Sequence, residues 1–190
     1  MIDLFITSIR ESPIFLAAQL VGIAGMVISI ISFQSNKKKH ILVFQSIASF
    51  IWGMHYVMLG AYTGAGINFI EVVRNLIFAR GDKLKRPAIW GILFVIIFAL
   101  IGYFTWVGIL SLAITLISIL VTLAFCFGNP RVMRLCATAS SMIWLIYNGS
   151  QLSLAGVITE SFCLISLLVA FWRFDIRKQP QTYDKSNTGK

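Results

Sequence analysis

The sequence predicts an all-α membrane protein in which seven transmembrane helices form two parallel three-helix-bundle repeats joined by a linker helix. Three observations lead to this fold class. The 190 residues are 58% hydrophobic and 12% charged, with a mean hydropathy of +0.85, far more apolar than a soluble core requires. Seven apolar runs approach the roughly 20 residues that cross a bilayer as a helix. Two parts of the chain also match each other at one constant offset.

The predicted helices follow the apolar runs in chain order. The first run follows "MIDLFITSIRES", where Asp3 and Glu11 occupy the place of a basic signal-peptide region, so we expect this helix to be retained. The fourth run lacks charged and amide side chains, which is typical of a lipid-facing connector. The expected spans are roughly 13–33, 41–59, 63–80, 87–105, 108–127, 132–149 and 154–172.

The connections between the runs alternate strictly in charge. "QSNKKKHI", "RGDKLKRP" and "GNPRVMR" are basic, whereas "LGAYTG", "YFTWVG" and "GSQLS" carry no charged side chain. Of the sixteen Lys and Arg, only Arg10 falls on the uncharged side. The positive-inside rule assigns the basic side to the cytoplasm. We therefore expect an extracytoplasmic amino terminus at 1–12 and a polar cytoplasmic tail at 174–190.

An internal repeat is visible when the sequence is shifted by 92 residues without a gap. "SFIWGMHY" then falls on "SMIWLIYN", with Trp52 on Trp144 and His55 on Tyr147. The shift spans three successive helices, which predicts repeats at 13–80 and 108–173 around the linker 87–105. A displacement of four spans preserves orientation, so the repeats are parallel and related by an axis along the membrane normal. Further identities at this offset are Phe33 with Phe125 and Gly64 with Gly156.

Each predicted repeat places a polar residue sixteen positions after its Trp, Asn68 after Trp52 and Glu160 after Trp144. This 3-1-3 pattern resembles the SWEET and PQ-loop transporter superfamily. More closely, "WGMHYVMLGAYTGAGINFIEVVRNLI" and "ITESFCLISLLVAFWR" are similar to the YgjV family of bacterial inner-membrane proteins, over the chain up to about residue 175. The resemblance implies a multi-pass protein of the bacterial inner membrane.

SWEET-like proteins line a central sugar pocket with such Trp and Asn pairs, and a Pro-Gln pair in the first helix of each repeat serves as their hinge. The resemblance therefore implies a central pocket here. The chain departs from the pattern at the hinge, because "SFQS" keeps Gln34 without the proline and "FCFGNP" has neither residue in place. It departs again at Glu160, which replaces the second Asn.

Polar and aromatic side chains form a stripe on each predicted second and third helix. At about 100° per residue, positions 45, 49, 52 and 56 share a narrow arc, as do 141, 144 and 148, while 68, 71 and 75 share a face of the third helix. Such side chains are costly against lipid, so we expect them to face the bundle interior. The predicted solute-binding residues are Ser49, Trp52, Tyr56, Asn68, Asn75, Ser141, Trp144, Asn148 and Glu160.

Each titratable candidate also has a structural interpretation. Glu71 and Arg74 have the spacing of an i, i+3 ion pair that fixes helix packing, an alternative to direct solute contact. Glu160 has no basic residue within a helical turn, which suits proton coupling or cation binding, or a cap on a polar cluster. His55 is a third proton-coupling candidate, and the alternative is a hydrogen-bonded interior histidine.

The two Trp residues likewise allow two interpretations. An indole face stacks on a sugar ring or on a cation, and amides or carboxylates bind hydroxyls or amines. Trp52 and Trp144 would then line a pocket for a small polar solute. The alternative is that both simply pack between helices.

Two function classes follow from these observations. The first is a transporter of a small polar solute, sugar-like or amino-acid-like, with or without proton coupling; the second is a non-transporting membrane receptor or assembly factor. No metal spacing, phosphate loop or nucleophilic triad is present in the sequence, so we expect no enzyme, cofactor or metal. The net charge of +9 lies largely in loops that face anionic lipid heads. The expected partners are a small-molecule solute and membrane lipids, with no nucleic acid.

Overall fold

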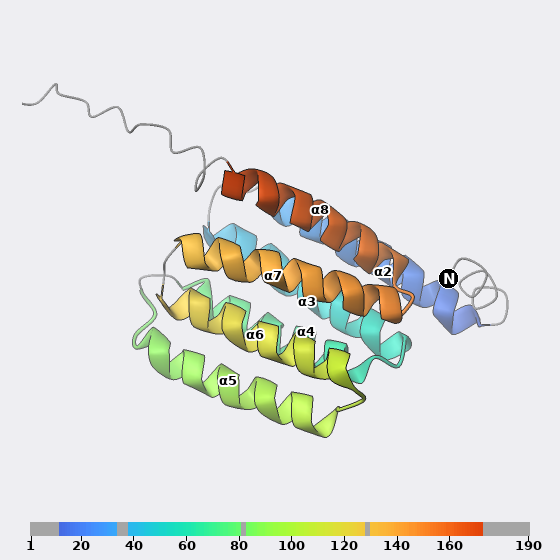
Figure 1. The fold of residues 1–190 in the computed structure, drawn as a ribbon, viewed down its shortest axis with the longest axis horizontal. Helices are drawn as coiled ribbons and strands as arrows, with labels where there is room; N and C mark the ends of the chain where they lie inside the picture. The colour runs from blue at the N-terminus through green and yellow to red at the C-terminus, as the bar shows by residue number, and fades with distance from the viewer. Residues whose placement is uncertain (1–11, 34–37, 81–82, 128–129, 173–190) are drawn as a thin grey trace, which may run out of the picture.

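The computed structural model describes residues 12–33, 38–80, 83–127 and 130–172. Each helix lies within a few residues of a predicted apolar run, so the prediction of an all-α protein is confirmed for these residues. The helices are coloured in chain order in Figure 1: α2 (Pro13–Phe33), α3 (Lys38–Met58), α4 (Tyr62–Phe78), α5 (Pro87–Phe104), α6 (Ile109–Phe127), α7 (Pro130–Ser150) and α8 (Leu154–Phe171).

Helix boundaries follow from local chemistry. The helices α2, α5 and α7 begin at a proline, whose fixed φ suits the first helical turn and whose missing N–H has no partner to lose there. Ser153 caps α8 by accepting a hydrogen bond from the Gly156 N–H. The turns after α3 and α7 each contain a left-handed residue, Gly60 at φ 71° and Leu152 at φ 54°.

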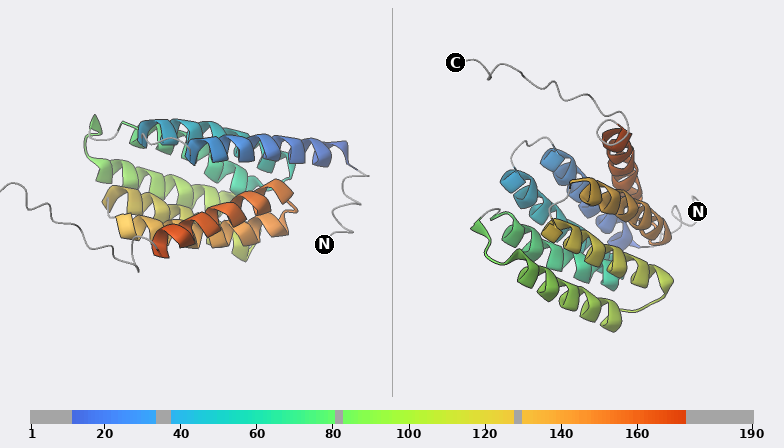
Figure 2. Two further views of the ribbon diagram at one scale, coloured as in Figure 1. Left: turned by 90° about the horizontal axis from the view of Figure 1, so that it is seen from above. Right: turned by 60° about the vertical axis from the view of Figure 1, so that its left-hand side comes forward.

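The helices form two facing layers. The first layer contains α2, α3 and α4, and the second contains α8, α7 and α6, so that α2 packs against α8 and α4 against α6 (Figures 1 and 2). The four even-numbered helices run in one direction and the three odd-numbered helices run in the other (Figure 1). As a result, α2 begins and α8 ends at opposite ends of the bundle.

The linker helix α5 lies at the edge formed by α4 and α6. One narrow stripe of α5 is buried, at Gly91, Phe94, Phe98 and Gly102. Phe94 contacts Phe78 of α4 with ring centroids 6.4 Å apart. Ile89, Ile92, Ile96 and Leu100 on its other sides are exposed, as expected of a helix that connects the two layers and faces lipid.

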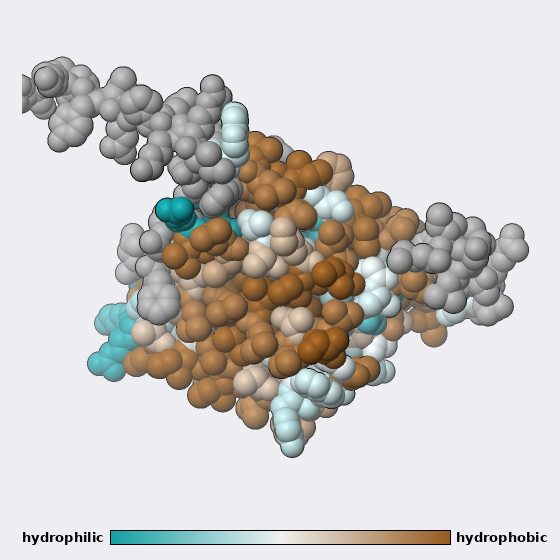
Figure 3. Space-filling view, in the orientation of Figure 1, coloured by the Kyte–Doolittle hydropathy of each residue, from teal (hydrophilic) through white to brown (hydrophobic). Residues whose placement is uncertain are grey.

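Apolar side chains dominate the exterior of the bundle. Figure 3 shows a broad hydrophobic face, with hydrophilic residues gathered mainly at its margins. Among the described residues, three helical segments are long and apolar enough to span a membrane: Pro13–Ser32, Lys39–Met58 and Pro87–Phe104. Two further apolar segments, Ile109–Ala124 and Leu154–Val169, are shorter. The remaining helices α4 and α7 carry polar interior stripes that lower their hydropathy, and seven spans stay a prediction.

The two ends of the bundle differ in charge. We call the end that holds residues 59–61, 105–108 and 151–153 the uncharged end, because these connections contain no charged side chain. We call the opposite end the basic end, because it carries exposed Lys39, Arg80, Lys83, Lys85, Arg86 and Arg131. Arg74 belongs to neither end, since it is buried inside the bundle at 4% exposure.

Candidate functional site

The polar stripes predicted from sequence face the interior of the bundle. Glu71 and Glu160 keep partly exposed side chains, with Glu71 at 19%. Gln45 is half-buried. The other eight stripe residues of α3, α4 and α7 are buried, and so is Arg74 beside them. The eight are Ser49, Trp52, Tyr56, Asn68, Asn75, Ser141, Trp144 and Asn148.

Four aromatic rings join α3 to α7 between the layers. The Tyr56 ring lies between the two tryptophans, with centroids 6.1 Å from Trp52 and 5.7 Å from Trp144. Tyr147 completes the group at 5.5 Å from Trp144 and 5.9 Å from Tyr56. The structure therefore brings the two predicted tryptophans into one aromatic cluster, formed by Trp52, Tyr56, Trp144 and Tyr147. Only 9% of Trp52 and 8% of Trp144 is exposed.

Hydrogen bonds connect the layers on the side of this cluster nearest the uncharged end. The Tyr56 hydroxyl donates to Asn148 Oδ1 at 2.8 Å, and Asn148 Nδ2 donates to the Trp144 carbonyl of its own helix at 2.9 Å. The Gly64 N–H, in the first turn of α4, donates to the Tyr147 hydroxyl at 3.2 Å. Both buried hydroxyls thus have a partner in the opposite layer.

His55 forms a second connection between the layers. Its Nδ1 lies 2.7 Å from the Ala18 carbonyl and its Nε2 lies 2.8 Å from Ser153 Oγ. A carbonyl can only accept, so Nδ1 carries the hydrogen. Because Ser153 Oγ also accepts the Gly156 N–H at 3.2 Å, its own hydrogen is free to be donated to Nε2 of a neutral imidazole. Both ring nitrogens are satisfied, which favours the structural interpretation of His55.

Gln19 adds a third connection that sequence reasoning missed. Its Nε2 donates to the Leu152 carbonyl at 3.0 Å, and its Oε1 accepts the Leu154 N–H at 3.2 Å. The amide therefore satisfies two backbone groups at the α7–α8 turn and fixes α2 against the start of α8. The signal was present in the sequence, since an amide in the middle of an apolar run is costly unless it finds a partner.

Glycines allow the close approach of these groups. A Cβ at Gly22 would lie 2.9 Å from the His55 ring, and one at Gly25 would lie 3.1 Å from the Trp52 ring. A Cβ at Gly64 would lie 2.9 Å from the Tyr147 ring. These three positions accommodate the rings of the opposing helices because they lack a side chain, and no sequence pattern had singled out Gly22 or Gly25.

The i, i+3 ion pair predicted on α4 is confirmed. Arg74 Nη2 lies 3.1 Å from Glu71 Oε1. The guanidinium also donates to Thr122 Oγ1 of α6 at 3.2 Å and to Asn75 Oδ1 at 3.2 Å, and it lies over the Phe98 ring of α5 at 5.9 Å. Arg74 thereby connects three helices while it compensates the charge of Glu71.

Glu160 lies on the inner face of α8, beside the second layer's central helix. Its carboxyl group is hydrogen-bonded to the Ser141 hydroxyl of α7. Glu71 and Tyr56, both from the first layer, lie within electrostatic range of this carboxyl group. The structure therefore brings Glu160 to the space between the layers, near the aromatic cluster.

The four residues that define the predicted site lie at one depth in the bundle. Trp52 and Trp144 each precede the last residue of their helices by six positions, and Asn68 and Glu160 each follow the first residue of theirs by six. At 1.5 Å per residue, all four lie about 9 Å from the uncharged end. Asn68 Nδ2 donates to the Gly64 carbonyl at 2.9 Å, one turn closer to that end.

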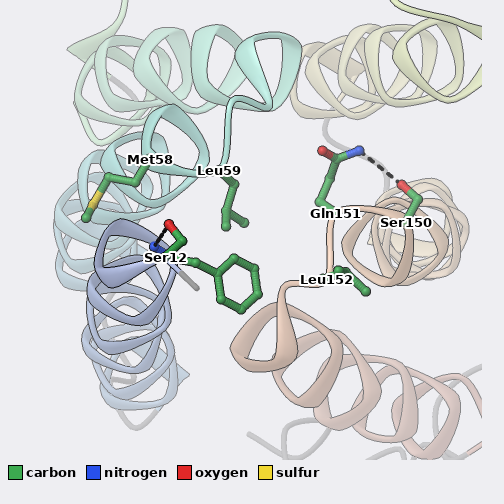
Figure 4. Close-up of a pocket in the computed structure, with 7 residues that line it drawn as sticks. Ser12, Met58, Leu59, Ser150, Gln151 and Leu152 are labelled. Atoms are coloured by element: carbon green, nitrogen blue, oxygen red, sulfur yellow. Dashed lines mark hydrogen bonds between the residues drawn. The ribbon is translucent and has the colours of Figure 1, made fainter. Parts of the chain in front are cut away.

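A cavity of about 420 Å³ lies at the uncharged end. Figure 4 shows its lining residues arranged around the space between α2, α3 and the α7–α8 turn. The cavity lies on the outer side of the hydrogen bonds that join the two layers. Leu152 lines it, and the Leu152 carbonyl accepts the hydrogen bond from Gln19. None of the predicted site residues lines this cavity. Its wall consists of Ser12, Phe15, Met58, Leu59, Ser150, Gln151 and Leu152.

Comparisons with known proteins agree with the apolar character of the chain. A family model described as "Bacterial inner membrane protein" matches residues 16–178. The chain is 27% identical over 179 residues to the inner membrane protein YgjV of Escherichia coli (strain K12), an alignment that covers 88% of this chain and 96% of that protein. No solved structure matches. An inner-membrane location follows from the match and the exposed apolar helices. The chain belongs to the YgjV family of bacterial inner-membrane proteins.

Proposed function

We propose that this chain is a transporter of a small polar solute, sugar-like or amino-acid-like, which binds between the two helix layers at the level of Trp52 and Trp144. One observation carries the proposal. The polar side chains of Asn68 in α4 and Glu160 in α8 lie at the same depth as an aromatic cluster from α3 and α7, and hydrogen bonds close the bundle just beyond them. Polar side chains in a membrane interior are costly and are found where a solute or ion passes.

An internal duplication of SWEET type would explain this convergence, and the two turns at the uncharged end support it. Both turns have the same three backbone hydrogen bonds at positions 92 residues apart, and both have a left-handed residue at equivalent places, 60 and 152. The bonds after α3 are Leu59 to His55, Gly60 to Val57 and Ala61 to Tyr56, and those after α7 are Gln151 to Tyr147, Leu152 to Gly149 and Ser153 to Asn148.

Contacts between the layers support the same duplication. His55 reaches the start of α8 through Ser153, and Tyr147, its partner in the 92-residue shift, reaches the start of α4 at Gly64. Tyr56 and Asn148 are also partners in that shift, and they bond to each other. A pair of equivalent residues in mutual contact is expected on a two-fold axis. Here that axis would run between α3 and α7, along the helices.

The arrangement suits alternating access. At the uncharged end the layers are held together by a few neutral hydrogen bonds, each contributing about 1 kcal/mol, so separation there is energetically feasible. Towards the basic end α8 diverges from α2 (Figure 2). We therefore propose that the structure represents a form closed at the uncharged end, and that the 420 Å³ cavity outside the closure is the entrance to the path.

The orientation proposed for the chain places the uncharged end outside the cytoplasm. The exposed basic residues of the described helix ends lie at the opposite end, which the positive-inside rule assigns to the cytoplasm. A carboxyl-terminal fusion to a reporter that is active only in the cytoplasm should be active. Activity of a periplasm-specific reporter at the same position would reverse the orientation.

Flux into proteoliposomes, measured over a panel of sugars, neutral amino acids and amines, tests the proposed function. Trp52→Ala and Trp144→Ala should each lower the flux of the transported solute at least about tenfold, because each removes a ring from the binding level. Trp106→Ala is the matched control, since Trp106 is 55% exposed in the α5–α6 connection, and it should transport like the parent.

Two results would contradict transport. If no solute of the panel crosses the vesicle membrane faster than in empty vesicles, the receptor or assembly alternative replaces the proposal. Suppose instead that a solute crosses while both Trp variants carry it at the parental rate and unfold at a lower temperature than the parent. The tryptophans are then packing residues, and the solute does not bind at their level.

A further inference from the structure

The interior of the bundle contains an unequal number of acidic and basic groups. In the described part of the chain, the acidic residues are Glu71 and Glu160 alone, and both lie on inward faces, of α4 and α8. Among the same residues, Arg74 is the buried arginine and Arg134, in the first turns of α7, is half-buried, while Lys39, Lys83 and Lys85 are exposed near the basic end. The inward-facing carboxyl groups of Glu71 and Glu160 thus have one fully buried guanidinium between them, that of Arg74.

Arg74 forms an ion pair with Glu71. The guanidinium lies 3.1 Å from Glu71 Oε1, and its other contacts bind it to Asn75 and to Thr122 of α6. This geometry holds the positive charge on the side of the first layer that faces α5 and α6. Glu160 instead has the Ser141 hydroxyl as its hydrogen-bond donor, and its charged neighbour across the layers is Glu71, which repels it.

A carboxyl group inside a membrane protein stays ionised when a positive charge compensates it, and otherwise it takes up a proton. A neutral solute bound beside Glu160 would leave the ionised form uncompensated, whereas a cationic solute would supply the missing partner of the carboxylate. The surrounding rings favour the second case. Trp144 lies one turn from Ser141 on α7, at the depth of Glu160, and Tyr56 packs on Trp144 at 5.7 Å. Indole and phenol faces attract cations.

We infer that the solute of the central site is a small organic cation, an amine or quaternary ammonium, with the Glu160 carboxylate as its counter-ion and the indole of Trp144 as its wall. This inference rests on the proposed transport function and specifies its substrate class. His55 takes no part in charge compensation, because its two nitrogens bond to Ala18 and Ser153.

Two pairs of probes separate charge from shape. Choline and 3,3-dimethylbutan-1-ol differ by a nitrogen in place of a carbon, and putrescine and butane-1,4-diol differ by ammonium groups in place of hydroxyls. Binding to the purified full chain is measured by calorimetry in detergent, and counterflow is measured in proteoliposomes, both at one fixed pH near neutrality. In at least one pair the cation should bind at least about tenfold more tightly than its neutral partner.

Variants of Glu160 test whether its charge causes the tighter binding of the cation. Glu160→Gln should reduce the affinity for the preferred cation to that of its neutral partner, and Glu160→Asp should retain a preference. Ser161→Ala, a neighbouring change on the same helix whose hydroxyl bonds to Val157 of α8 itself, should behave like the parent. If Glu160→Gln does not fold, the ratio between each cation and its neutral partner in the parent still decides whether the site selects charge.

The outcomes distinguish this inference from the proposed function. Equal binding of cation and neutral partner, absence of binding by both cations, or an unchanged cation preference in Glu160→Gln overturns the cationic substrate. If glucose or glycine is then transported in a manner that depends on Trp52 and Trp144, transport stands and only the substrate class is wrong. If no solute is transported at all, both proposals fail.

Discussion

The two layers share the backbone hydrogen bonds of the turns after α3 and α7 but differ in chemistry at positions 92 residues apart. Asn68 in the first layer corresponds to Glu160 in the second at the 92-residue offset, and Glu71 corresponds to Cys163. The first layer contains a carboxylate that is compensated within one helical turn by Arg74. The second contains a carboxylate whose donor is a hydroxyl. Residues 92 positions apart in the two layers therefore differ in charge, and the interior is asymmetric, with the compensated carboxylate in the first layer.

Among the variants proposed here, loss of the buried ion pair between Arg74 and Glu71 should lower stability the most. Arg74→Met should lower the free energy of unfolding by about 3–5 kcal/mol, because it leaves the carboxylate of Glu71 and the oxygen of Asn75 without their donor inside the bundle. The measurement is denaturant unfolding in detergent micelles, followed by circular dichroism. The double variant with Glu71→Gln should recover a large part of the loss.

Lys83→Met is the control for this prediction, since Lys83 is exposed and such changes alter stability by less than about 0.5 kcal/mol. A loss below about 1 kcal/mol in Arg74→Met would show that the ion pair is not required, and the first layer would then resemble the second in carrying an uncompensated carboxylate.

Glycines at matching places in the two layers should be equally intolerant of a side chain. A Cβ at Gly64 would lie 2.9 Å from the Tyr147 ring, and one at Gly156 would collide with the Asn148 amide. Gly64→Ala and Gly156→Ala should each lower the free energy of unfolding by about 1–3 kcal/mol through overpacking.

Gly149 in α7 provides the matched control, because no atom lies within 4 Å of its hypothetical Cβ. Gly149→Ala should leave stability unchanged or raise it by up to about 1 kcal/mol through helix propensity. If Gly64→Ala is tolerated as well as Gly149→Ala, the two layers do not meet at α4 and α7 as closely as the structure has them.

Hydropathy and charge were sufficient to predict the helices and their order. The periodicity of the polar stripes also predicted which faces of α3, α4 and α7 are buried, because a bilayer leaves polar side chains no alternative but the interior. The pairing of Glu71 with Arg74 followed from i, i+3 spacing alone. These are local or one-dimensional properties, which a sequence carries directly.

The contacts between layers could not be predicted in the same way. That His55 bonds to Ala18 and Ser153, or that Gln19 bonds to the α7–α8 turn, depends on how two distant helices are placed side by side. The role of Gly22 likewise exists only when the His55 ring lies against it. Separations of 37 and 98 residues leave no periodic signal for such partners.

The hydrogen bond between the two central helices should be measurable as a coupling. Tyr56→Phe and Asn148→Ala each remove one partner of a 2.8 Å bond. A double-mutant cycle should give a coupling free energy of about 0.5–1.5 kcal/mol, the range for a neutral buried bond. Tyr62→Phe, at an exposed position in α4, should show no coupling to Asn148→Ala. A coupling near zero would remove Tyr56 and Asn148 from the proposed closure.

The smallest expected effect concerns the two turns at the uncharged end, where the same left-handed conformation is occupied by different residues. Gly60 has φ 71° and Leu152 has φ 54°. A non-glycine residue in this region costs about 1–2 kcal/mol, so Gly60→Ala should lower the free energy of unfolding by about 1 kcal/mol. Leu152→Gly removes the same strain but also a half-buried side chain and adds backbone entropy to the unfolded chain, so it should change stability by less than about 1 kcal/mol, in the stabilising direction or near zero. Gly108→Ala, at a position with open space around its Cβ and no left-handed φ, serves as the control in the same denaturation assay.

A loss of stability in Gly60→Ala together with no loss in Leu152→Gly would fit one backbone turn used twice with unequal residues. A marked loss of stability in Leu152→Gly would mean instead that the leucine side chain itself holds the α7–α8 turn in place.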